Sequence, residues 1–214
     1  MKLYWHYCRS GFSNCYILGT DYRKEPPLPG EKPLPREAII IDPGEMDIKI
    51  LNMIEDNDYT LKGVLITHDH PHHIKGLNTI MRIYNTDIYA INPLVGKHYT
   101  TLVRDGDVVD IGQFRVEVIS IPGHSADSAA FKISRLLFTG DSLSAGLVGS
   151  TSSSYAAAAM IRALRSKILS LPGDYTILPG YGPPSSLEAE RRFNLGVNSF
   201  VAHENRRPVF RVEL

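Results

Sequence analysis

The sequence is poor in the features that mark several classes of protein. Only two of its 214 residues are cysteine and only one is tryptophan. No apolar run approaches the roughly 20 residues of a membrane-spanning helix, and Met1–Gly19 lacks the continuous apolar stretch of a signal peptide. Basic and acidic residues balance at 23 each, which favours neither nucleic acid nor an anionic membrane as a partner. We therefore expect a cytoplasmic protein that binds neither.

The scarcity of cysteine also limits the chemistry expected of it. Cys8 and Cys15 are not spaced as the C-x-x-C pair of a zinc finger, and both lie in strand-like segments. In a reducing compartment we expect two buried thiols without a chemical role, and a disulfide or redox pair is the alternative. The isolated histidines His6, His98 and His203 lie outside any motif and are expected to be structural or surface residues.

What the chain does have is enough apolar material for a core, since 43% of its residues are hydrophobic. A length of 214 residues fits one domain spanning 1–214, with two small domains as the alternative. The one break in composition is the segment 21–37, which contains five prolines and is expected to be a surface loop.

Strand-like runs, rich in β-branched and aromatic residues, recur along the whole chain. They are Tyr4–Cys8, Cys15–Gly19, Ala38–Asp42, Val64–Thr67, Ile88–Ile91, Arg115–Ile121, Ala129–Ile133, Leu136–Thr139 and Thr176–Leu178. Helical spacing of apolar residues predicts helices over Met46–Asp56, Ile74–Tyr84, Tyr155–Leu171 and Leu187–Val197. This order favours an α+β fold in which two packed sheets carry helices on the outside, an αββα four-layer sandwich.

A cluster of histidines follows one of these strands. The run Val64–Thr67 leads directly into four histidines within six residues: His68, His70, His72 and His73. A single histidine is usually packed in the core or solvated, but four together are hard to bury without a cation, because each imidazole needs a partner. Imidazole is a common ligand of zinc, iron and other transition metals, so the cluster predicts a metal site.

Two further segments place candidate ligands after strands. His124 lies in Pro-Gly-His-Ser, where the glycine allows the backbone to turn the imidazole towards the first cluster. Asp141 lies in Thr-Gly-Asp-Ser, and a carboxylate there could bridge two cations. Either segment alone would mean little, but the three in this order are strong evidence for a metal centre.

In these motifs the chain resembles the metallo-β-lactamase superfamily, whose ligands follow an HxHxDH motif, a later PGH, a bridging Asp and a last His near the C-terminus. The pattern is most similar to that of glyoxalase II-like hydrolases, which carry a PGHGP loop and a helix start of an acidic residue, two arginines and an asparagine. The corresponding segments here are 179–183, PGYGP, and 190–194, ERRFN. The resemblance implies the αββα fold and one or two metal ions.

Two positions depart from the family pattern, because His72 replaces the aspartate of the motif and Tyr181 replaces the last histidine. The resemblance gives the first metal its complete set of ligands, His68, His70, His124 and Asp141. It leaves the second metal with His73 and Asp141, and with His72 and Tyr181 at the altered positions. Tyr181 is either a loop residue packed between prolines or a phenol hydrogen-bonded to a ligand of the metal, and these readings weigh about equally.

The altered positions favour an unusual metal chemistry. Five histidines and one bridging carboxylate are similar in ligand balance to the oxygen-binding di-iron protein hemerythrin. Flavodiiron proteins of the superfamily reduce dioxygen or nitric oxide with a fused flavodoxin domain, for which we expect no room here, and hence no flavin. The leading hypothesis is therefore a di-iron protein that binds dioxygen as a sensor and signals to a protein partner. Iron is the favoured metal, with zinc and manganese as alternatives.

The alternative is an enzyme, a zinc-dependent thioester or ester hydrolase of the glyoxalase II type, acting through a hydroxide held by the metal. A degenerate fold used only for interaction is a third reading, which the four intact ligands oppose. Because many members of the superfamily are dimers, a homodimer is a further expectation.

Overall fold

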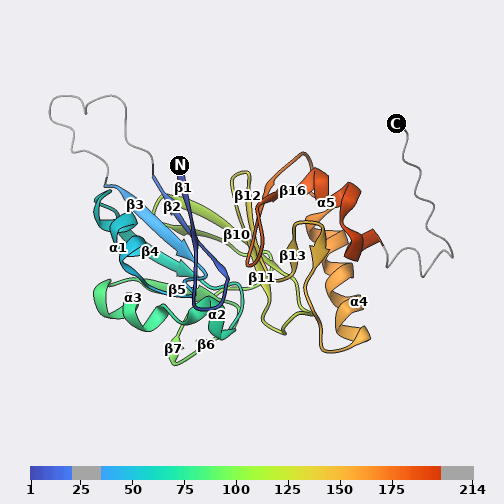
Figure 1. The fold of residues 1–214 in the computed structure, drawn as a ribbon, viewed down its shortest axis with the longest axis horizontal. Helices are drawn as coiled ribbons and strands as arrows, with labels where there is room; N and C mark the ends of the chain where they lie inside the picture. Colours follow the sequence, from blue (N-terminus) through green and yellow to red (C-terminus); the bar gives the residue numbers. More distant parts are fainter. Residues whose placement is uncertain (21–34, 199–214) are drawn as a thin grey trace.

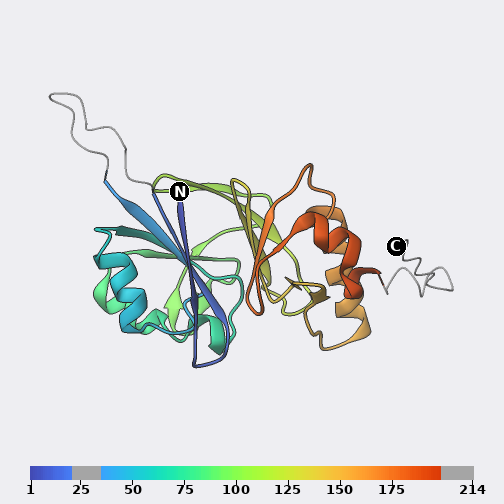
Figure 2. The ribbon, with the colours of Figure 1, turned by 45° about the horizontal axis from the view of Figure 1, so that its top comes forward.

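The computed structural model describes residues 1–20 and 35–198, and these form two six-stranded sheets with helices on their outer faces (Figures 1 and 2). The first sheet has the order β1-β2-β3-β4-β5-β8, with strands Lys2–Tyr7, Asn14–Gly19, Glu37–Ile41, Thr60–Leu65, Asp87–Ala90 and Thr101–Leu102. The second has the order β16-β15-β12-β11-β10-β9, with strands Ser185–Ser186, Thr176–Pro179, Leu136–Gly140, Ala129–Ile133, Phe114–Ser120 and Val108–Ile111. Two short pairs, Leu94–Val95 with His98–Tyr99 (β6, β7) and Leu143–Ser144 with Leu147–Val148 (β13, β14), complete the strands.

The helices lie on the two outer sides of the sheet pair (Figure 1). Those of the first half are α1 (Ile48–Glu55), α2 (Pro71–Ile74) and α3 (Leu77–Ile83). Those of the second half are α4 (Ser154–Ala163), which runs on into a π-helical turn over Leu164–Ile168, and α5 (Leu187–Phe193). The prediction of an αββα sandwich is therefore confirmed.

Three apolar cores separate the four layers, and strand β3 shows how the sequence builds them. Ile40 faces α1 and packs with Ile50 and Ile54, whereas Ile39 and Ile41 face the second sheet. This alternation is what a strand covered on both faces requires, because successive side chains point to opposite sides. A third core, which includes Leu137 and Met160, lies between the second sheet and its helices.

The predicted helix Ile74–Tyr84 is confirmed over Leu77–Ile83, which forms α3, but it begins later than predicted. Ile74 ends the separate helix α2, and Lys75 and Gly76 lie between the two helices, where the Gly76 N–H donates to the carbonyl of Pro43. The last helix is also shorter than predicted, since Asn194 adopts an extended backbone and residues 195–198 are helical again after it. The periodicity of apolar residues does not predict these helix ends, because contacts with segments distant in the sequence determine both of them.

Most of the proline-rich segment, residues 21–34, lies outside the described residues, and β3 already begins at Glu37. Within the described ranges, no helix is both long and apolar enough to cross a membrane.

Candidate metal centre

The metal-ligand candidates meet because their strands end at a common edge. The segment His68–His73 follows β4 of the first sheet, whereas His124 follows β10 and Asp141 follows β12 of the second. Strands β12 and β15 are parallel neighbours, so Tyr181, after β15, emerges at the same edge as Asp141. The site is therefore built across the junction of the two sheets.

Four of the predicted ligands form one compact group. One donor atom from each of His68, His70, His124 and Asp141 lies within 4.8 Å of the other three. His124 Nε2 is 3.1 Å from His70 Nδ1 and 3.3 Å from Asp141 Oδ2. Donors about 2.0–2.2 Å from a tetrahedral zinc ion lie roughly 3.3–3.6 Å from each other, so these separations fit a shared cation.

Buried polar atoms without hydrogen bonds support the same conclusion. His68 Nε2, His73 Nε2 and Asp141 Oδ1 are buried without a hydrogen bond of good geometry, although the last two lie 3.2 Å apart as an ion pair. A buried polar atom left unpaired costs about 1–3 kcal/mol, and native proteins contain few of them. All three belong to side chains around Asp141, so a cation there would satisfy all of them.

Neighbouring groups fix which nitrogen of each imidazole faces the centre. His124 Nδ1 donates to the carbonyl oxygen of Ser150 at 2.8 Å, which leaves Nε2 as the ligand atom. The Thr67 hydroxyl donates to Asp42, so at 3.0 Å it accepts from His68 Nδ1 and leaves His68 Nε2 free. Burial, and then the charge of His73, lower the pKa of His68 to about 4, so its ring is neutral near pH 7.

His73 occupies a second position on the other side of Asp141. The ring is fully buried between two carboxylates, with Nδ1 3.2 Å from Asp42 Oδ2 and Nε2 3.2 Å from Asp141 Oδ1. Burial disfavours the charged ring, but the two carboxylates outweigh it and raise the pKa of His73 to about 10. A metal that binds Nε2 must therefore displace a proton.

Asp42 is a functional candidate that the sequence reasoning missed. Besides His73 it accepts hydrogen bonds from the backbone N–H and the hydroxyl of Thr67, and it holds a left-handed φ of +50°. In metal sites, a carboxylate commonly accepts a hydrogen bond from the ring nitrogen of a histidine that does not bind the metal, and so orients the ring. Its place after an apolar strand, directly before Pro43-Gly44, was a pattern that could have found it.

We expect Asp42→Asn to weaken metal binding at His73, because an amide has one acceptor oxygen where the carboxylate uses two: Oδ1 accepts from the Thr67 N–H, and Oδ2 accepts from the Thr67 hydroxyl and His73. Loss of such a partner reduces metal affinity by roughly 10–100-fold. Competition with a chelator, with circular dichroism as a check of the fold, measures the effect. An unchanged affinity for both metal equivalents would contradict the assigned role of Asp42.

With this geometry in place, comparison with known proteins identifies the fold family. Residues 34–181 match the model of the metallo-beta-lactamase superfamily. The chain belongs to that superfamily. Among its relatives, an uncharacterised protein of Mycobacterium tuberculosis is 30% identical over 85% of this chain and 91% of its own length. A hydroxyacylglutathione hydrolase of Haemophilus influenzae is 26% identical over 77% of this chain and 89% of its own.

Solved structures of the superfamily share the fold. A protein crystallised in a di-iron-bound form superposes with a TM-score of 0.69 at 23% identity, over 90% of this chain and 98% of its own. At that identity the likeness establishes the fold alone. The chain is thus a metal-binding member of the superfamily, and its own residues must decide which metal chemistry it carries.

The two positions that depart from the superfamily pattern contact each other. His72 is exposed and lies outside the group of four donors, and its Nδ1 is 2.9 Å from the hydroxyl of Tyr181. Burial and the charges of Asp141 and Asp42 raise the pKa of Tyr181 to about 12, so the phenol stays protonated near pH 7. Coordination of metal by His72 and Tyr181 stays a prediction.

The remaining histidines are assigned no part in this centre. His98 Nε2 pairs with the side chain of Asn78, as expected of a structural or surface residue. His203 lies outside the described residues. His6 is buried and belongs to a separate cluster.

Gly180 fits closely under the second metal position. A Cβ atom at this residue would lie 2.4 Å from Asp141 Oδ1 and 2.7 Å from His73 Cε1. We therefore expect Gly180→Ala to displace Asp141 and to reduce metal binding at His73, measured as metal content after dialysis. Gly106→Ala is the control: Gly106 has a φ of +84° and no neighbouring atoms, so alanine adds backbone strain of about 1–2 kcal/mol there without touching the centre. Equal loss of metal in both variants would contradict the steric explanation.

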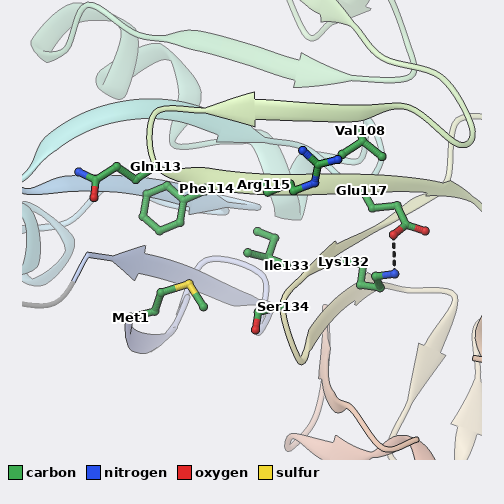
Figure 3. A pocket seen from close by; sticks show the side chains of 9 residues that line it. All are labelled: Met1, Val108, Gln113, Phe114, Arg115, Glu117, Lys132, Ile133 and Ser134. Atoms are coloured by element: carbon green, nitrogen blue, oxygen red, sulfur yellow. Dashed lines mark ion pairs between the residues drawn. The ribbon is translucent and has the colours of Figure 1, made fainter. Parts of the chain in front are cut away.

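Of two cavities in the described part of the chain, one adjoins the metal centre and the other lies apart from it. A cavity of about 220 Å³ opens beside the metal centre and is lined by His124, Gly140, Asp141, Ser144, Gly149, Ser150 and Tyr181. A larger one, of about 500 Å³, is lined by none of the metal-ligand candidates and lies along β9, β10 and β11 next to Met1 (Figure 3). An ion pair between Lys132 and Glu117 crosses one end of it (Figure 3). The chemistry of the centre therefore belongs to the smaller cavity.

Proposed function

We propose that the protein is a metal-dependent hydrolase of thioesters or esters. The observation that carries the proposal is the complete group of four donors, which opens on one side into the cavity of about 220 Å³. Relatives named hydroxyacylglutathione hydrolases support this class of substrate over others.

The chain's residues supply what such a reaction needs. A divalent cation held by His68, His70, His124 and Asp141 would supply Lewis acidity for the activation of water and the polarisation of a carbonyl. Because His68 and His124 are fixed in one tautomer by Thr67 and Ser150, both present a lone pair without rearrangement. Because the two imidazoles are already oriented, less free energy is needed to arrange them during the reaction.

Tyr181 lines the cavity as a neutral phenol and offers a hydrogen-bond donor to a carbonyl oxygen that gains negative charge. Its position next to His72 ties it to the loop of the histidine cluster. We propose that Tyr181 stabilises charge on the substrate, as an oxyanion donor does, and not that it acts as a base. Loss of one such donor costs about 10²–10³-fold in kcat.

The hypothesis of an oxygen-binding di-iron sensor has less support. It depends on five histidines acting together, and His72 contacts Tyr181 outside the group of four donors. Of the two relatives reported above, the one whose name gives an activity is a hydroxyacylglutathione hydrolase. Oxygen binding and a signalling partner therefore stay predictions.

Activity measurements with protein loaded separately with zinc and iron distinguish the two. We expect turnover of hydroxyacyl-glutathione or simpler acyl thioesters that is lost on chelation and in His124→Ala, and that returns when metal is added back to the wild type. Absence of turnover across thioesters and aryl esters at full metal loading would overturn the proposal. An oxygen-dependent absorption band in the iron-loaded protein would instead support the sensor.

A further inference from the structure

A second cluster of metal-binding side chains lies on the first sheet and shares no residue with the centre around Asp141. His6 on β1 pairs directly across the strands with Cys15 on β2, and Cys8 lies two residues after His6. Opposite residues of an antiparallel pair share a face, as do residues i and i+2 of a strand. His6, Cys8 and Cys15 therefore point to one side, where Glu45 of the segment between β3 and α1 covers them.

The donor atoms of this cluster are close enough for one cation. Ligand atoms of His6, Cys8 and Glu45 all lie within 4.8 Å of one another, and His6 Nε2 is 3.1 Å from Glu45 Oε1. Bonds of about 2.0–2.1 Å to nitrogen and about 2.3 Å to sulfur place donors roughly 3.3–3.7 Å apart, so only small shifts are required. Asp47, whose Oδ2 is 3.6 Å from His6 Nε2, and Cys15 lie beside the group as further donors.

Hydrogen-bond donors surround the Cys8 sulfur and the Glu45 carboxylate. The Cys15 thiol and the Glu45 N–H donate hydrogen bonds to the Cys8 sulfur. The backbone N–H groups of Arg9 and Ser10 donate to the Glu45 carboxylate. Backbone donors that orient ligands in this way are common around metal sites.

We propose that His6, Cys8 and Glu45 form a second metal site, which takes one zinc-like divalent cation. A thiolate, a carboxylate and a neutral imidazole together neutralise a divalent charge, which makes its burial at this depth favourable. A sulfur, nitrogen and oxygen donor set suits borderline-soft cations such as zinc and cobalt over magnesium or calcium. Two of the three side chains are buried, as is typical of structural rather than catalytic zinc.

The site would fix the turn between β1 and β2, which packs against His72. A Cβ atom on Gly11, in this turn after Cys8, would lie 2.7 Å from His72 Cγ. In the same turn the Ser13 hydroxyl donates to the His72 carbonyl at 2.6 Å. A cation at Cys8 and Glu45 would hold this turn against the segment before α1, and so would position His72, whose ring contacts Tyr181 at the cavity of the main centre.

Cobalt(II) loading of the full chain under reducing, oxygen-free conditions tests the proposal, because only a thiolate ligand gives a near-ultraviolet sulfur-to-cobalt charge-transfer band. The centre around Asp141 has no cysteine among its ligands, so the band reports the second site alone. We expect one cobalt equivalent with this band in the wild type, retained in Asp141→Asn and lost in Cys8→Ser. A wild type without the band, or a band unchanged by Cys8→Ser, overturns the proposal.

If Cys8→Ser does not fold, a second variant, His6→Gln, tests the same site. His6→Gln retains both thiols and a hydrogen-bonding group of similar length, and we expect it to lose the cobalt equivalent that carries the band. Zinc content of the same variants, measured with the Asp141 centre removed by Asp141→Asn, should fall from one equivalent to none. Retention of that zinc in His6→Gln shows that the cluster is an ordinary set of hydrogen bonds and refutes the site.

Discussion

Asp141→Asn is expected to abolish metal binding at both halves of the main centre and to remove hydrolysis with it. One carboxylate lies within 3.6 Å of His68, His73 and His124, so it is the only ligand candidate shared by all three histidines. An amide keeps the shape but loses the negative charge and one acceptor. Loss of an outer partner alone costs roughly 10–100-fold in metal affinity, so loss of this shared ligand should cost more.

Metal content after dialysis and kcat/KM for the best thioester measure this result together. Asp110→Asn is the matched control, because it makes the same chemical change at an exposed carboxylate that pairs only weakly with Arg115. The control should retain metal and activity. If Asp141→Asn binds its metals as tightly as the wild type, the assignment of Asp141 as the shared ligand is refuted.

The double variant His72→Asp with Tyr181→His is expected to gain a tightly bound second metal. The two substitutions replace a pair of side chains that contact each other by a carboxylate and an imidazole, the groups that the superfamily pattern has there. An added anionic ligand strengthens binding of a divalent cation, so we expect the metal content to rise by one equivalent, bound at the centre around Asp141, with an affinity at least about 10-fold above that of the wild type at this position.

Titration with zinc, followed by metal analysis, measures the gain; turnover is not used, because both variants also remove the Tyr181 hydroxyl proposed to act on the substrate. Tyr181→Phe is the control: it removes the hydroxyl that contacts His72 but introduces no ligand, so it should leave the stoichiometry unchanged. If the double variant binds no more metal than the wild type, the altered positions do not limit the second site. A wild type that already binds two iron ions at the centre around Asp141, both lost in Asp141→Asn, would favour the di-iron hypothesis.

The sequence predicted the layered fold and most of the centre because both leave local patterns. Apolar runs such as Ala38–Asp42 recovered strand β3, and the ligand candidates His68, His124 and Asp141 each lie one to three residues after a predicted strand. Residues that follow these strands lie close together in space, because the strands end at the same edge of the two sheets, whatever the separation of the residues in sequence. Fold and ligand group were therefore predictable from short motifs.

Contacts between distant segments were not predictable in this way. Asp42 and His73 are 31 positions apart, and nothing local to either residue shows that their side chains meet. The same holds for Glu45, which joins His6 across 39 positions, and for the contact of His72 with Tyr181 across 109. Which side chain orients a ligand depends on how distant segments of the chain pack together. The pattern of residues in a single sequence carries little information on that packing.

The junction of the two sheets has a consequence for the stability of the whole domain. His68, His70 and His73 come from the first sheet, whereas His124 and Asp141 come from the second, so an ion at the centre cross-links the two. Because the unfolded chain cannot hold these groups together, each equivalent bound adds to the free energy of unfolding, by about 2.7 kcal/mol at a free-metal concentration 100 times Kd. The thermal stability of the fold would then rise with the free-metal concentration, and loss of metal would remove this cross-link between the two sheets.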